Sequence, residues 1–82
     1  MSRENAGYTI TDSVQVGDYE IVIGERKGAP APYVCWYCKD GGNYFWGDYC
    51  STRSAALRSL CNRIDKDLRV AEAQKNHAAA VR

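Results

Sequence analysis

Residues 33–60 decide the fold, with the sequence YVCWYCKDGGNYFWGDYCSTRSAALRSL. Aromatic and β-branched side chains dominate Tyr33–Lys39, and aromatic side chains dominate Tyr44–Cys50, which favours a pair of strands. Between them, residues 40–43 (DGGN) are typical of a hairpin turn, because glycine adopts positive φ without a Cβ clash. The hydroxyl residues at 51–52 can each cap a helix. The stretch therefore predicts a hairpin that leads into a helix.

The period of the apolar residues changes after Thr52. The spacing becomes that of one stripe of an α-helix, made of Leu57, Leu60, Cys61, Ile64, Leu68 and Ala71. No proline or glycine interrupts residues 48–82. We expect a C-terminal helix whose last residues, 73–82, fray because they have little to bury.

Two further strands are expected upstream of the hairpin. Tyr19–Glu25 (YEIVIGE) is the clearer one, and Tyr8–Val16 alternates over part of its length. Gly17-Asp18 separates them, with glycine at the first central position of a two-residue turn. Residues 26–32 contain two prolines and are expected to form a loop.

The predicted fold class is α+β, with a three- to four-stranded antiparallel sheet packed on one C-terminal α-helix in β-β-β-α order. A single domain is expected over residues 8–72. Residues 1–7 are expected to form a disordered N-terminus, and residues 73–82 the fraying helical tail.

The charge of the chain is small and uneven. The net charge is +1, but residues 1–50 carry −3 and residues 51–82 carry +4. No apolar run approaches the roughly 20 residues that a membrane span needs, and the polar N-terminus opens onto no secretory signal. We therefore expect a cytoplasmic protein with no membrane partner, in which the four cysteines are free thiols.

The turn divides the hairpin into two faces. With Gly41-Gly42 at its tip, Tyr37 faces Trp46, and Cys35 faces Asp48. An uncharged row is expected to form the core beneath the helix, with Gly47 leaving room for the ring of Trp36: Val34, Trp36, Cys38, Phe45, Gly47 and Tyr49. The opposite row is expected to face water: Tyr33, Cys35, Tyr37, Lys39, Tyr44, Trp46 and Asp48.

The aromatic residues of the water-facing row predict an interaction surface. Contiguous apolar surface on a small domain marks a binding site, and Tyr and Trp are enriched at interface hot spots. The residues expected to bind a partner are Tyr33, Tyr37, Lys39, Tyr44, Trp46 and Asp48. The occupant is either a larger host protein or a second copy of the chain in a homodimer.

Metal binding and catalysis are not expected. The pair Cys35-x-x-Cys38 has zinc-knuckle spacing, and with Cys50 and Cys61 it forms the alternative four-cysteine zinc site. A regular strand, however, points Cys35 and Cys38 to opposite faces. His77, the only histidine, lies in the alanine-rich tail, far in sequence from the hydroxyls of residues 51–54, and Asp48 has no evident catalytic partner. We expect no cofactor and no enzyme activity.

The β-β-β-α order over roughly residues 19–68 resembles the DNA-binding modules at the N-termini of tyrosine recombinases and in plant AP2 factors. That resemblance implies a sheet that enters the major groove. Under this alternative the DNA-binding residues would be Arg26, Lys27, Lys39, Arg53 and Arg58. Acidic Asp48 and Glu20 share the predicted outer face with Lys39, a poor balance for a polyanion, so nucleic acid is the less favoured partner.

A second resemblance concerns the string WYCKDGGNYFWGDY followed by AALRSL. It resembles small proteins carried by phages and conjugative elements of gut Firmicutes, which implies a mobile-genetic-element origin. With the small size of the chain, this resemblance predicts a non-catalytic protein-binding module that inhibits a host protein, as anti-CRISPR and other anti-defence proteins do.

Overall fold

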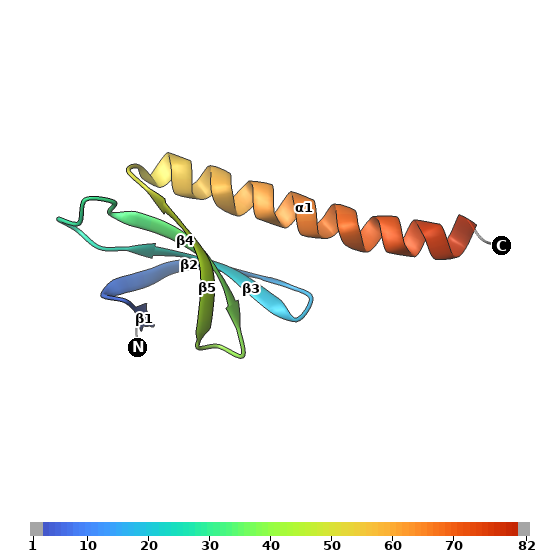
Figure 1. Cartoon of the computed structure of the whole chain (residues 1–82), viewed down its shortest axis with the longest axis horizontal. Coiled ribbons are helices and arrows are strands. Elements are labelled where there is room, and N and C mark those ends of the chain that lie inside the picture. The colour runs from blue at the N-terminus through green and yellow to red at the C-terminus, as the bar shows by residue number, and fades with distance from the viewer. Residues whose placement is uncertain (1–2, 81–82) are drawn as a thin grey trace.

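The structure, a computed structural model, describes residues 3–80, with side chains described for residues 3–68. It is a five-stranded antiparallel sheet in the sequential order β1-β2-β3-β4-β5, followed by one helix (Figure 1). The elements are β1 (Glu4–Asn5), β2 (Tyr8–Val16), β3 (Tyr19–Glu25), β4 (Tyr33–Lys39), β5 (Asn43–Cys50) and α1 (Arg53–Ala80). The α+β class and the antiparallel sheet with a C-terminal helix are confirmed, and the sheet has more strands than the three to four expected.

The additional strand β1 lies within residues 1–7, the stretch expected to be disordered. It pairs with β2, and the N–H of Ile10 donates to the carbonyl oxygen of Arg3 at 2.8 Å. The Arg3 side chain forms an ion pair with Glu20 at 3.0 Å and donates to the hydroxyl of Tyr44 at 3.2 Å. One arginine therefore ties the start of the chain to β3 and β5.

The helix begins where the hydroxyl residues predicted a cap. The N–H of Ala55 donates to Oγ1 of Thr52 at 3.1 Å, which satisfies one of the first free donors of the helix. From there α1 crosses the sheet and continues beyond its edge, so that the molecule is 55 Å long and only 18 Å thick (Figure 1). The backbone of residues 73–80 belongs to this helix, and residues 81–82 lie outside the described part.

Both faces of the twisted sheet carry buried side chains. The helix-side core, between the sheet and α1, consists of Ile21, Ile23, Cys35, Cys50, Ala56 and Leu60. The far-side core, on the face away from α1, consists of Tyr8, Val22, Val34, Trp36 and Cys38.

For Val34, Trp36 and Cys38 the expectation of a place beneath the helix is therefore wrong, although all three are buried. Small side chains at Cys35 and Ala56 allow α1 to approach one face. On the other face the large indole is enclosed by the rings of Tyr8, Tyr44 and Tyr49, with centroids 5.6–6.2 Å from its own. Aromatic rings replace a helix as the cover of that face.

The hairpin β4–β5 differs from the expected register near its turn. Cys35 faces Asp48 as predicted, but Tyr37 faces Phe45 instead of Trp46, because the pairing shifts between Cys35 and Tyr37. A three-residue loop, residues 40–42, joins Lys39 to Asn43. The prediction for Gly47 is confirmed in its main point: a Cβ there would lie 2.6 Å from Nε1 of Trp36. The glycine makes room for this ring on the face away from α1.

Candidate partner-binding site

Four rings gather on the helix side of the sheet. We define the aromatic cluster as Tyr19, Tyr37, Phe45 and Trp46. Tyr37 and Phe45 are stacked, with centroids 5.8 Å apart and planes 17° apart, as expected for cross-strand partners. Tyr19 and Trp46 meet Phe45 edge-on, at 5.9 and 5.3 Å. The cluster joins β3, β4 and β5 into one apolar surface.

Trp46 is the exposed end of this cluster. Its side chain is 75% exposed, and its φ of 53° lies in the left-handed region that tryptophan rarely adopts. The unusual φ coincides with the register shift of β5, which is a β-bulge. Bulges redirect side chains, and this one directs a large ring into solvent beside Tyr37 and Phe45.

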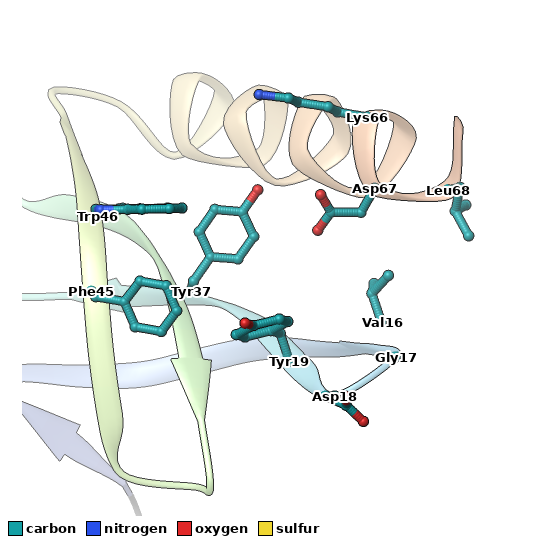
Figure 2. Close-up of a pocket in the computed structure, with 10 residues that line it drawn as sticks. All are labelled: Val16, Gly17, Asp18, Tyr19, Tyr37, Phe45, Trp46, Lys66, Asp67 and Leu68. Carbon is teal, nitrogen blue, oxygen red and sulfur yellow. The ribbon is translucent and has the colours of Figure 1, made fainter. Parts of the chain in front are cut away.

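A pocket of about 590 Å³ lies between the aromatic cluster, the β2–β3 turn and residues 66–68 of α1 (Figure 2). Val16 and Leu68 add apolar wall opposite the rings. The carboxylate of Asp67 is directed from the helix toward the hydroxyl of Tyr37, whereas Asp18 is directed away from the pocket (Figure 2). The interior is therefore aromatic, with one acidic group at its wall.

Arg63 holds the helix against the aromatic cluster. Its guanidinium lies 4.7 Å from the ring centroid of Tyr37, and its Nη2 donates to the carbonyl oxygen of Trp46 at 2.7 Å. Its Nη1 is buried and has no hydrogen-bond partner in the described part of the chain. Burial raises the pKa of Tyr37, and the charge of Asp67 raises it further, while Arg63 opposes both. Tyr37 therefore remains a neutral hydrogen-bonding group at physiological pH.

The six residues predicted to bind a partner do not form one row. Tyr37, Trp46 and Asp48 line one hollow beside Arg63. Lys39 lies at its margin, with Nζ 5.6 Å from the ring centroid of Tyr19. The remaining two lie elsewhere: Tyr44 packs on Trp36 on the far face, and half-buried Tyr33 packs against the helix-side core.

Sequence reasoning missed several residues of this site. Tyr19 could have been found, because a regular hairpin register brings it opposite Lys39 on the same face. Phe45 was placed in the core beneath the helix and opposite Cys38; its pairing with Tyr37 in the aromatic cluster could not be predicted, because it results from the bulge. On α1, the spacing of Arg63, Lys66 and Asp67 at i, i+3 and i+4 was a usable signal for a shared face.

The basic residues of the DNA-binding alternative are distributed over the molecule. Arg26 and Lys27 follow β3, next to the start of β4, whereas Lys39 ends β4. Arg53 is engaged in an ion pair with Asp12 at 3.0 Å. The fifth, Arg58, lies on α1. These residues therefore lie on different elements, and Arg26 and Lys27 are at the opposite end of β4 from Lys39.

The four cysteines of the zinc alternative are also separated. Cys35 and Cys50 belong to the helix-side core, Cys38 to the far-side core, and Cys61 is exposed on α1. Burial raises the pKa of the first three thiols, so they stay protonated and weakly nucleophilic. Within the described part of the chain, no three His, Cys, Asp or Glu side chains are grouped as metal ligands. His77 has no described side chain.

Within residues 3–80, α1 is too polar to cross a membrane.

Comparisons of the chain with protein-family models, with curated proteins and with solved structures found no match.

Proposed function

We propose that the chain is a non-catalytic protein-binding module that binds its partner through the aromatic cluster and the adjoining pocket. The observation that carries the proposal is Trp46. A tryptophan that is 75% exposed and held at a φ of 53° costs stability in backbone strain and in apolar exposure. A partner that buries the ring would offset the second cost, and such rings are frequent interface hot spots.

The charge around the pocket supports a protein partner over a nucleic acid. Asp18, Asp48 and Asp67 accompany Arg63 and Lys66 in the walls of the two adjoining hollows. A surface with this balance offers no excess of cations for phosphate. We propose a larger host protein as the partner, which the chain inhibits on behalf of a mobile element. A second copy of the chain, in a homodimer, is the other occupant.

Site-specific photocrosslinking tests the proposal. We would place p-benzoylphenylalanine at Trp46, in the full chain expressed in its native host, and irradiate the cells. The matched control carries the same group at Tyr49, which is 54% exposed and contacts Trp36 on the far face. We expect a discrete adduct from position 46 and none of that mass from position 49.

The mass of the adduct separates the occupants, because a second copy adds 9.2 kDa and a host protein adds its own mass. No adduct at position 46, or the same adduct from both positions, would contradict a binding site at the aromatic cluster.

A further inference from the structure

We infer that the pocket beside the aromatic cluster receives a cationic side chain, a lysine or an arginine, from the partner protein. This inference rests on the proposed function and names the chemistry that the pocket recognises. It follows from the rings, from the carboxylate that faces them and from the shape of the space between them.

The rings provide faces that attract cations. The face of an aromatic ring is electronegative, and a cation within about 6 Å of the centroid is stabilised by it. The chain already uses this property twice in the cluster: Arg63 lies 4.7 Å from the Tyr37 centroid, and Lys39 lies 5.6 Å from the Tyr19 centroid. In both contacts a cation lies over the ring of a tyrosine of the cluster.

Asp67 supplies the opposite charge inside the pocket. Asp67 is half-buried and its carboxylate is directed toward Tyr37 (Figure 2). Neither of the ion pairs among the described side chains includes it. The neighbouring Lys66 is directed along the helix, with its ammonium away from the pocket interior (Figure 2). A purely apolar occupant would cover the carboxylate and remove its water without compensation. An ammonium or guanidinium would pair with it.

The shape of the pocket fits a long amphipathic side chain. Lysine and arginine bury an apolar stem and keep a charged head, so they need apolar walls that end at an acidic group. Val16 and Leu68 provide such walls beside the rings, and Asp67 provides the acidic end. Within about 590 Å³ the pocket has room for a whole side chain of this length.

NMR titration of the ¹⁵N-labelled full chain tests the inference. The probes are N-acetyl-lysine methylamide and N-acetyl-arginine methylamide, and the matched neutral probe is N-acetyl-norleucine methylamide, which keeps the stem and lacks the charge. We expect saturable shifts of the Trp46 indole and of the amides of residues 17–19 and 66–68 with both cationic probes. We expect the norleucine probe to bind at least about fivefold more weakly.

Two variants locate the charge. Asp67→Asn keeps the size of the side chain and removes its charge, and should weaken binding of the lysine probe about fivefold, because an opposite charge about 4 Å away in water is worth about that factor. The control, Asp40→Asn, removes an exposed carboxylate in the hairpin loop, at a φ of 57° that asparagine tolerates, and should change binding less than twofold. Raising the salt concentration should weaken the cationic probes alone.

Two results would overturn the inference, and a third would overturn only the assignment of the cationic side chain to a foreign partner. Equal binding of the norleucine probe, with no effect of Asp67→Asn, would assign the pocket to an apolar side chain; a crosslink at position 46 would then still support protein binding. If no probe shifts the NMR signals of the pocket residues, the pocket does not bind a side chain of this kind. A dimer in sedimentation equilibrium that Asp67→Asn dissociates would replace the foreign partner by a second copy of this chain.

Discussion

A methyl group added at Gly47 tests the close packing of the far-side core. In Gly47→Ala the new Cβ would lie 2.6 Å from Nε1 and 2.9 Å from Cδ1 of Trp36, and 3.1 Å from Cε1 of Tyr49. Contacts this short force the rings to move. The indole cannot move freely, because the rings of Tyr8 and Tyr44 also enclose it. Overpacking of this kind costs about 1–3 kcal/mol, so we expect the free energy of unfolding to fall by that amount.

Urea denaturation followed by tryptophan fluorescence measures the loss. The matched control is Gly42→Ala, where an added Cβ meets nothing within 4 Å, and which should change stability by less than about 0.5 kcal/mol. In the Trp36→Leu background, Gly47→Ala should cost less than it does beside the indole, since neighbouring residues couple in a double-mutant cycle. A Gly47→Ala protein as stable as the control would show that β5 does not pass directly over the indole.

Three further outcomes are expected. Trp36→Ala should lower the free energy of unfolding by about 3–5 kcal/mol, because this residue is only 4% exposed. Trp46→Ala should lower it by less than about 1 kcal/mol, because Trp46 is 75% exposed. Equal losses measured by calorimetry would contradict this ranking. The hydrogen bond from Arg3 lowers the pKa of Glu20 below 4.5. The ionised Glu20 therefore stabilises the fold fully above pH 4.5, and this stabilisation is lost as the pH falls through the depressed pKa. In Glu20→Gln, the free energy of unfolding measured against pH should lack this loss. Duplex DNA should bind no more tightly than about micromolar at physiological salt in fluorescence anisotropy, and nanomolar binding that falls about a thousandfold between 50 and 200 mM salt would support a DNA reader instead.

Local patterns were sufficient to predict most of the elements. The turn at Gly17-Asp18 joins Val16 to Tyr19 with Gly17 at a φ of 59°, as its position in a two-residue turn required. The helix begins after the capping Thr52, where the apolar period changes. Strand β1 was missed because two residues leave no periodic signal, and because the contacts that hold it come from Arg3, far away in sequence from its partners.

The assignment of faces could not be predicted by counting charges. Both rows of β4 are mostly apolar, and each contributes to a buried core, because the sheet is covered by α1 on one face and by aromatic rings on the other. Which of the two faces the helix covers depends on the size of the side chains there. The helix packs on the face of the small Cys35 with its own small Ala56, whereas the large Trp36 lies on the other face. Such a choice depends on tertiary packing, which periodicity does not encode.

The candidate site was predictable only in part for the same reason. Trp46 was correctly placed on an exposed surface, and Tyr37 was correctly placed beside it, although as a half-buried neighbour and not as its cross-strand partner. Tyr44 was placed with them, whereas the structure turns it to the far face. One residue inserted into the pairing accounts for the difference, since a slip of one position exchanges the faces of a strand.

The bulge at Trp46 links the two cores to the site. Without it, Phe45 would lie opposite Cys38 on the far face, and Tyr44 would lie on the helix side, as the regular register required. With it, Phe45 stacks on Tyr37 in the aromatic cluster, and Tyr44 covers Trp36 where Arg3 can reach its hydroxyl. The strained backbone at position 46 is thus stabilised by packing on both faces of the sheet. Those contacts hold the bulge in place without burying the ring of Trp46, which stays 75% exposed. Replacement of this ring therefore tests the proposed binding role separately from folding.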